Sequence, residues 1–569
     1  MAKSVHRVGL QKASTLKSIE NLRLFDFLIA IQVLLFFRFS YVYAISKVDF
    51  AHDGTILPPS LAFLDGYNVN GEAFSQYGPV SAWINSLILL LPFDKPLLTL
   101  KIFDLLTLTA CVVVTYVIAA LHLNRISGFI GCTIWMLSAY YFTPGDWTYL
   151  AWPSTQGLFM LVLLLLITIL MLGTNPRLKP SFFAFIPGLF LGALFFTRWH
   201  LATVVLIAYI LVIFLALKSK SRENKDLASV LKSIVLWAFF WCLVISLYLI
   251  LTNSFLNFVT QAVLAPSKYY PNQNGNALNL FANYFSRYAS LLTFSLLGFI
   301  FLVSSGSKKL KSGILPEVFF MFTFCLAFLN LKGDPSIRTS VMYSLFLLGG
   351  VLLFRILIEW GDSPTQMEPR KLIELLIWLI GVFSLVQIYP TFDVRHGFWA
   401  GLLLCVLSIH RFLDYTSSRG FFPIIVILLS LLIGMSSDYG QSRPRNYIQV
   451  QSENILNGMY VSQEQYDYIK SVDLFYNELP VNKKYIFRCF DGLYSIWNSR
   501  FLSADAFWGD WPWQWTVNSH QMIRTRSYSG NFGVILCTDP GNAANWAKEN
   551  GYLVIKSNDT LTYVEKLVN

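Results

Sequence analysis

The residues from Leu24 to Ser46 read LFDFLIAIQVLLFFRFSYVYAIS, and those from Lys47 to Pro79 read KVDFAHDGTILPPSLAFLDGYNVNGEAFSQYGP. The first segment is apolar over roughly the 20 residues that a helix needs to cross the hydrocarbon of a bilayer. The second segment is a loop dense in Gly, Pro, Asn and Tyr, and it carries Asp53 close to the end of the apolar run. A carboxylate held just outside a bilayer indicates chemistry at the membrane surface.

Apolar segments of similar length recur along the chain. The sequence is 55% hydrophobic and 13% charged, with a mean hydropathy of +0.54, which excludes an ordinary soluble protein. We therefore expect a multi-pass α-helical membrane protein with about thirteen transmembrane helices. The expected spans lie near residues 24–46, 97–121, 127–143, 151–172, 182–197, 200–217, 230–252, 289–305, 314–331, 340–359, 372–389, 397–410 and 421–436.

The net charge of +11 is distributed in a way that argues against a nucleic-acid partner. If the N-terminus is cytoplasmic, the basic residues gather in the inside loops, and the outside loops hold far fewer. This is the positive-inside bias, so the excess basic charge is a signal of topology. We expect a protein of the cell (plasma or inner) membrane with membrane lipids around it. The inside residues include Lys3, Arg7, Lys12, Lys17, Arg23, Arg125, Arg177, Lys179, Lys218, Lys220, Arg222, Lys225, Lys308, Lys309, Lys311, Arg370, Lys371, Arg411 and Arg419.

The spans and charges divide the chain into three parts. Residues 1–23 form a cytoplasmic N-terminus, and residues 24–436 form the transmembrane domain. Its first outside loop covers residues 47–96, in which Tyr77 to Leu91 is expected to lie along the interface as a helix. Residues 437–569 are polar and are expected to form a soluble extracytoplasmic α/β domain.

The C-terminal part alternates short β-type runs with helical stretches, which is typical of a small α/β domain. The β-type runs are Lys484–Cys489, Gly533–Cys537 and Tyr552–Ile555, and the helical stretches are Gln463–Leu479 and Ala543–Asn550. In an oxidising compartment Cys489 and Cys537 are candidates for a disulfide, because each ends a predicted strand. The alternative is two buried free thiols. No Cys/His spacing resembles a zinc site.

Asp53 is the first candidate for chemistry, because it follows a span end closely and lies between His52 and Gly54, where we expect a tight turn. A carboxylate near the interface can accept a proton from a substrate hydroxyl. The alternative is a solvated acid of a loop.

A second group of candidates consists of cations on the outside that break the positive-inside bias. An anionic ligand is a common reason for such positions, and Arg suits phosphate because its fork bonds two oxygens. Taken one by one, each is better explained as a partner of a lipid headgroup or an acidic loop, but their shared location on one face favours a common phosphate ligand for some of them. The group contains Arg198, Lys268, Arg287, Lys332, Arg338, Arg395 and His396.

Two outside loops have compositions that indicate ligand binding. Asp146 lies between Trp147 and Pro144-Gly145, and aromatic faces and carboxylates are both suited to sugar rings. An incidental acid in an aromatic belt is the alternative. The loop from about Asn253 to Tyr288 is long and rich in Asn, Tyr and Phe, and long loops with their own composition tend to bind ligands.

With these residues in view, the chain resembles the GT-C class of membrane glycosyltransferases, which use polyprenyl-phosphate sugars and include aminoarabinose transferases and relatives of protein O-mannosyltransferases. The resemblance covers the topology of residues 1–436. It rests on Asp53, the stretch from Leu57 to Gly66, the stretch from Phe74 to Pro79, and Tyr389-Pro390 with Asp393 and His396. Many members have an Asp-Glu pair where this chain has Asp53-Gly54, which weakens the case for a metal held by paired carboxylates.

The resemblance implies a sugar donor on a polyprenyl phosphate, an acceptor hydroxyl on a glycan, lipid or protein, and transfer with inversion at the outer face. One carboxylate is sufficient for this, unlike the two of a hydrolase. No cofactor is implied, and a divalent metal is compatible with the site without being indicated. The implied roles are Asp53 as base, Arg338, Arg395, His396 and Arg198 at the donor phosphate, and His52, Gln76, Tyr77, Asp146, Lys268 and Asp393 at the substrate.

Two other functions compete with this interpretation. A multi-pass transporter or flippase would carry ionisable groups near the bilayer midplane, whereas here the polar residues cluster at the outer edge. A polysaccharide polymerase or ligase would also act on lipid-linked glycans at the outer face, but would usually centre on a large late loop.

Overall fold

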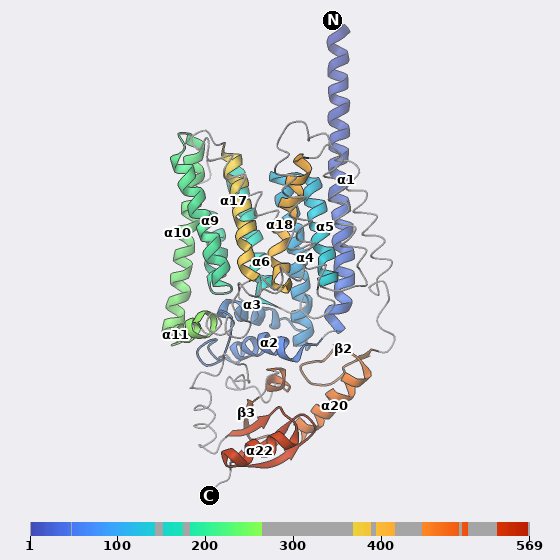
Figure 1. Cartoon of the computed structure of the whole chain (residues 1–569), viewed down its shortest axis with the longest axis vertical. Coiled ribbons are helices and arrows are strands. Elements are labelled where there is room, and N and C mark those ends of the chain that lie inside the picture. The colour runs from blue at the N-terminus through green and yellow to red at the C-terminus, as the bar shows by residue number, and fades with distance from the viewer. Residues whose placement is uncertain are drawn as a thin grey trace, which may run out of the picture.

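The structure is a computed structural model of the 569-residue chain. It describes residues 2–46, 48–142, 152–173, 183–264, 368–388, 394–415, 447–488, 492–498 and 532–566. The molecule is elongated, with the N-terminal helix at one end and the C-terminal segment at the other (Figure 1).

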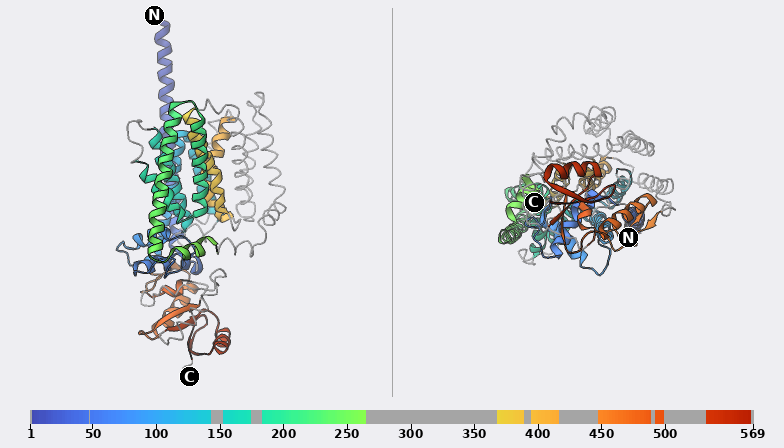
Figure 2. Two further views of the ribbon diagram at one scale, coloured as in Figure 1. Left: turned by 90° about the vertical axis from the view of Figure 1, so that its left-hand side faces the viewer. Right: turned by 90° about the horizontal axis from the view of Figure 1, so that it is seen from below.

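Long helices form a bundle along the main axis of the molecule (Figures 1 and 2). Among the described residues, five helical stretches are long and apolar enough to cross a membrane, and they lie in α1, α4, α6, α9 and α10. Each coincides with an expected span, so the multi-pass helical fold is confirmed; the expected spans at 289–305, 314–331, 340–359 and 421–436 lie outside the described residues. The bundle helices are α1 (Ala2–Ser46), α4 (Pro96–His122), α5 (Arg125–Phe142), α6 (Pro153–Gly173), α8 (Phe185–Phe195), α9 (Trp199–Lys218), α10 (Arg222–Leu251), α17 (Pro369–Phe383), which continues as η4 (Ser384–Ile388), and α18 (Val394–Tyr415).

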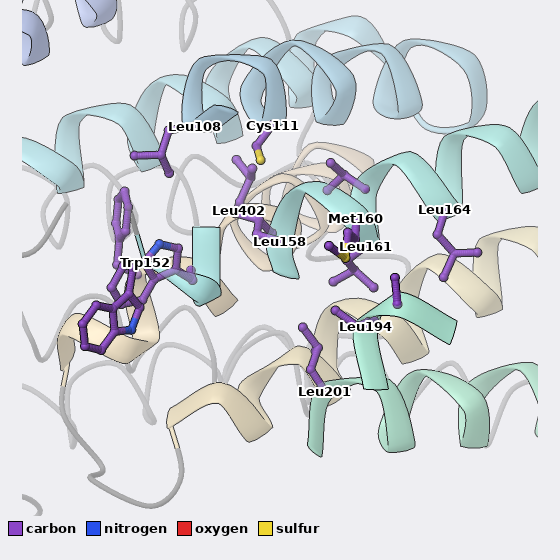
Figure 3. Packing of buried hydrophobic residues seen from close by; sticks show 14 of the residues in the cluster. Leu108, Cys111, Trp152, Leu158, Met160, Leu161, Leu164, Leu194, Leu201 and Leu402 are labelled. Atoms are coloured by element: carbon purple, nitrogen blue, oxygen red, sulfur yellow. The ribbon is translucent and has the colours of Figure 1, made fainter. Parts of the chain in front are cut away.

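Leucine-rich faces meet in the middle of this bundle, where Leu108 of α4, Leu161 of α6 and Leu194 of α8 are fully buried (Figure 3). By contrast, α10 exposes large apolar side chains such as Leu243 and Leu251 along its outer surface. An apolar outer surface is what a helix in contact with lipid requires, since lipid tails replace the protein core on that side.

Two shorter helices, α2 (Phe50–Leu64) and α3 (Pro79–Leu89), lie across one end of the bundle (Figure 1). The helix expected after Tyr77 is present as α3. The tight turn expected around Asp53 is wrong, because Asp53 lies in the first turn of α2. Gly54 and the Pro58-Pro59 pair are typical of a loop, but burial of the apolar side chains of Ile56 and Leu57 against the bundle outweighs that local preference.

The polypeptide returns to this end of the bundle after α10, through α11 (Phe255–Phe258) and the π-helix η1 (Val259–Leu264). Gln261 of η1 accepts hydrogen bonds from the side chain of Asn70, at 2.9 Å, and from the backbone N–H of Ser75, at 3.2 Å. These contacts hold the segment between α2 and α3 in place.

The C-terminal segment lies beyond α2 and α3 in both side views (Figures 1 and 2). A four-stranded sheet has the order β3-β4-β6-β5, in which β3 and β4 are parallel and the other pairs are antiparallel. All the expected strands and helices of this segment are confirmed, whereas β6 and the short β1–β2 pair were missed. The elements are β1 (Ile448–Gln449), β2 (Tyr460–Val461), α20 (Gln463–Asn477), β3 (Lys484–Arg488), η6 (Gly492–Ile496), β4 (Phe532–Leu536), α22 (Pro540–Asn550), β5 (Tyr552–Ser557) and β6 (Thr562–Lys566).

Candidate functional site

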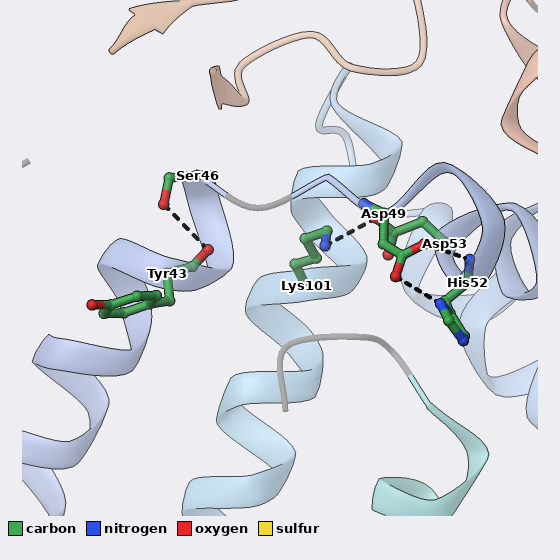
Figure 4. A network of polar contacts seen from close by, with 6 residues as sticks. All are labelled: Tyr43, Ser46, Asp49, His52, Asp53 and Lys101. Atoms are coloured by element: carbon green, nitrogen blue, oxygen red, sulfur yellow. Dashed lines mark hydrogen bonds and ion pairs between the residues drawn. The ribbon is translucent and has the colours of Figure 1, made fainter. Parts of the chain in front are cut away.

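Asp53 is placed by the first turn of α2, and the residue is 3% exposed (Figure 4). The helix begins after Asp49, whose Oδ1 accepts a hydrogen bond from the backbone N–H of His52 at 2.9 Å. This is the geometry of a side-chain N-cap. The backbone N–H of Asp49 in turn donates to Oδ2 of Asp53 at 2.9 Å, so the start of the helix holds this carboxylate in one orientation.

Lys101 of α4 is the cation that faces Asp53. Its Nζ lies 3.0 Å from Oδ2 of Asp53, and the two side chains are 1% and 2% exposed (Figure 4). Asp104, one turn further along α4, is also buried, and no hydrogen-bond partner of its Oδ2 is found among the described residues. Thr155 and the backbone of Trp152 interact with this second carboxyl group. Two carboxylates and one ammonium group are therefore enclosed where α2 meets α4 and α6.

Burial raises the pKa of Asp53, because a charged carboxylate loses its hydration there, and the positive charge of Lys101 offsets this only in part. At Asp49 burial also acts to raise the pKa, but the hydrogen bond and charge of His52 outweigh it, and the pKa is lowered. The pKa values of these two neighbouring carboxyl groups are thus shifted in opposite directions. Such a separation is typical of sites that transfer protons.

His52 connects the carboxylates to two aromatic side chains, Trp152 and Tyr77, which we call the aromatic wall. Its Nδ1 lies 2.6 Å from Oδ2 of Asp49, and its ring centroid is 5.6 Å from that of Trp152. Trp152 meets the ring of Tyr77 edge-on at 5.2 Å, and the guanidinium of Arg198 lies 5.2 Å from the centroid of Tyr77. Arg198 also hydrogen-bonds to the hydroxyl of Ser154.

This chain of contacts brings four of the predicted residues together: Asp53, His52, Tyr77 and Arg198. Gln76 is buried beside Tyr77. Arg395 and His396 lie in the first turn of α18, not in the loop before it, and their side chains fall outside the described part of the structure. Asp146, Lys268, Arg338 and Asp393 lie outside the described residues.

Two further observations concern metals and thiols. Within the described ranges, no group of three or more His, Cys, Asp or Glu side chains could hold a metal ion. Cys537 is disulfide-bonded, and Cys489, its expected partner, lies outside the described residues.

Sequence reasoning missed Lys101. It lies in an apolar run that was interpreted only as a membrane span. A charged residue within such a run is recognised as a candidate only when it is considered individually. The available signal was the spacing of Lys101 and Asp104, since two ionisable residues three positions apart share one face of a helix.

No protein-family model matches the chain, and no curated protein sequence matches it. Among solved structures, the oligosaccharyltransferase of Archaeoglobus fulgidus in complex with Zn and sulfate is 11% identical, with a TM-score of 0.47 over 94% of this chain and 72% of that one. ArnT from Cupriavidus metallidurans bound to undecaprenyl phosphate is 10% identical, with a TM-score of 0.44 over 95% of this chain and 97% of that one.

Proposed function

We propose that this chain is a membrane glycosyltransferase that moves a sugar from a polyprenyl-phosphate donor to an acceptor hydroxyl, with inversion, at the outer face of the membrane. The observation that carries the proposal is the enclosed Asp53–Lys101 pair at one end of the bundle, next to an aromatic wall and Arg198. Enclosing such a pair costs free energy, so its retention favours a role in chemistry.

In the proposed reaction, Asp53 takes the proton of the acceptor hydroxyl. The oxygen attacks the anomeric carbon from the side opposite the phosphate, and the bond between that carbon and the phosphate oxygen breaks. The polyprenyl phosphate leaves with the bonding electron pair. Because this leaving group carries its own charge, it needs cations more than a strong general acid.

Lys101 is the proposed first cation for the phosphate. An ammonium group has three N–H donors, so it can contact a phosphate oxygen while it remains near Asp53. Arg198 is the second proposed cation, and Arg338, Arg395 and His396 stay candidates for the same group. Tyr77 and His52 are proposed to contact the sugar or the acceptor, together with Gln76, Asp146, Lys268 and Asp393.

Two features support an outer location of the site. The described basic residues Arg125, Lys218, Arg222 and Arg370 lie at ends of helices remote from α2, which is the arrangement expected of cytoplasmic loops. The disulfide-bonded Cys537 belongs to the segment that lies next to α2, and disulfides persist in oxidising compartments. We therefore propose that residues 437–569 are an extracytoplasmic domain and residues 1–23 a cytoplasmic N-terminus.

A transporter or flippase is the second candidate, because Lys101 and Asp104 are ionisable groups inside an apolar helix. Their position argues against it. α4 begins at Pro96, so at ~1.5 Å per residue both groups lie within about 12 Å of its end and not at the midplane.

The test is an assay of the purified chain in lipid vesicles with a radiolabelled polyprenyl-phosphate sugar, and in parallel with the corresponding nucleotide sugar. We expect consumption of the lipid-linked donor alone, and inversion at the anomeric carbon of the product. Asp53→Asn should lower the rate on the order of a thousandfold, because the proton acceptor is lost.

Asp65→Asn is the matched control, since Asp65 is an exposed carboxylate that directly follows the last turn of the same helix. It should leave the rate unchanged. Donor movement across the bilayer without transfer would favour the transporter, and full activity of Asp53→Asn would remove the assignment of the base.

A further inference from the structure

The C-terminal segment contacts α2 on either side of Asp53. The first contact is at Gly54, where a Cβ would lie 2.5 Å from the backbone nitrogen of Leu493 and 2.6 Å from that of Gly492. Both atoms belong to the backbone of η6, so no side-chain rotation can make room. The backbone of a turn more than 400 residues away in the sequence is thus in direct contact with the residue after Asp53.

The second contact is made by Phe50, at the start of α2. Its ring is stacked on Trp497, with centroids 6.0 Å apart and an interplanar angle of 15°, and lies 5.4 Å from the ring of Tyr494. Tyr468 of α20 meets the same ring edge-on at 6.0 Å. Stacked and edge-on aromatic pairs of this kind stabilise a contact beyond the effect of the area that they bury.

The turn that makes these contacts is itself fixed within the C-terminal segment. Nε1 of Trp497 donates to Oδ1 of Asp473 at 2.7 Å, and its backbone carbonyl accepts from the N–H of Ile455 at 3.1 Å. The hydroxyl of Tyr476 donates to the carbonyl of Tyr494. All five residues of η6 are buried, so η6 meets α2 as a supported surface and not as a loose loop.

We infer that η6 is a positioning element of the proposed catalytic site: it fixes the first turn of α2 and excludes water from Asp53. This inference rests on the proposed function and extends it, because it makes the C-terminal segment a working part of the site. Gly54 and Phe50 are then positioning residues, which act through the orientation and hydration of the carboxylate between them.

The inference also accounts for a glycine at position 54. Any side chain here would meet the backbone of Gly492 and Leu493. The close contact with η6 therefore requires a residue without a side chain at position 54.

The charged groups that face Asp53 are few among the described residues. Asp49 directly precedes its helix, and Lys101 and Asp104 come from α4. His52 of the same helix contacts Asp49. The sequence of η6 contributes none, so its effect on Asp53 acts through exclusion of water and not through charge. Displacing η6 would let water reach the carboxylate and would lower its pKa toward the ordinary value.

The experiment compares Gly54→Ala and Phe50→Leu with the unaltered chain in the donor-turnover assay, as a function of pH. We expect kcat to fall on the order of a hundredfold in Gly54→Ala, because a small displacement of a reacting group has effects of that size. The KM for the donor should change little. The acidic limb of the pH profile should move to lower pH in both variants, which a change of stability alone would not produce.

Gly188→Ala is the matched control. A Cβ at Gly188 would lie 2.4 Å from Cβ of Trp237, so the change disturbs an equally tight helix contact, but between α8 and α10. It should leave the pH profile in place. If Gly54→Ala does not fold, Phe50→Leu decides, since it removes a contact without introducing a clash.

The outcomes separate the inference from the proposed function. Loss of turnover in Asp53→Asn, with kcat and pH profile unchanged in Phe50→Leu and in any folded Gly54→Ala, overturns the positioning role and leaves the proposed function intact. Full turnover in Asp53→Asn overturns the function itself. A shifted acidic limb in Phe50→Leu, absent from Gly188→Ala, supports the inference.

Discussion

Two carboxylates of the protein pair with cations at opposite ends of the bundle, and their surroundings differ sharply. Oδ1 of Asp26 accepts from Tyr116 at 2.6 Å and from Arg125 at 3.1 Å, and the side chains of Arg125 and Asp26 are 34% and 45% exposed. Asp53 and Lys101 are 1–2% exposed. Each pair joins a carboxylate to a basic side chain, and burial is the property in which they differ most.

The difference indicates two roles. An exposed ion pair contributes little to the free energy of unfolding, and its two ions keep most of their hydration. The Asp26 contact is therefore explained as a link between α1, α4 and α5. A buried pair loses the hydration of both ions, and replacement by apolar side chains is often neutral or stabilising. The Asp53 pair is thus a poor device for stability, and its position beside aromatic and cationic side chains favours a catalytic role.

The largest effect is expected from Lys101→Met, which leaves Asp53 enclosed without its cation. We expect a loss of about 3–5 kcal/mol in the free energy of unfolding, since that is the usual cost of stranding one partner of a buried pair. Denaturant titration of the purified chain in mild detergent measures it. A loss below about 1 kcal/mol would show that the pair is hydrated in solution, like the Asp26 pair.

Replacing both members, in a Lys101→Met and Asp53→Leu double variant, should restore most of that loss, because neither charge is then stranded. The double variant should nevertheless be inactive in transfer. The comparison is made with the two single variants in one thermodynamic cycle. If the double variant recovers both its stability and its transfer activity, the Asp53–Lys101 pair has a structural role and not a catalytic one.

The pH dependence of transfer should report the raised pKa of Asp53. A base works in its deprotonated form, so activity rises as pH increases through the pKa of Asp53. Because burial raises that pKa, the acidic limb should lie above the ordinary carboxyl range. Steady-state kcat/KM measured against pH checks this, and a limb at or below the ordinary range would point to Asp49, whose pKa is lowered.

The smallest effects are expected at the Asp26 pair. Asp26→Asn and Arg125→Gln should each change the free energy of unfolding by less than about 1 kcal/mol and leave transfer unaffected. The same denaturant titration measures them. If either variant lowers the free energy of unfolding as much as Lys101→Met does, the Asp26 and Asp53 pairs do not differ in their contribution to stability.

Much of the fold could be predicted from the sequence, because the signals are local. Apolar runs of membrane length locate α4, α6, α9 and α10, and turn pairs such as Asn550-Gly551 delimit the strands and helices of the C-terminal segment. Gly551 has φ +76°, a conformation that glycine adopts without strain, and it ends α22 where the sequence indicates.

The site could be predicted only in part. Asp53 was identified from its place after a span end and Arg198 as an outside cation that breaks the positive-inside bias, whereas His52 and Tyr77 were implied by the family resemblance. Lys101 was missed because its partner lies on another helix, and periodicity within one helix does not show which residue faces it. The contact between Gly54 and η6 has no local signal at all, since the two segments are distant in sequence and meet only through tertiary packing.

The most direct test of the account is the turnover of a polyprenyl-phosphate-linked sugar by Asp53→Asn and Asp26→Asn, each purified and reconstituted in the same way. We predict a loss on the order of a thousandfold in Asp53→Asn, and a rate within about twofold of the unaltered chain in Asp26→Asn. Equal rates in the two variants would contradict it.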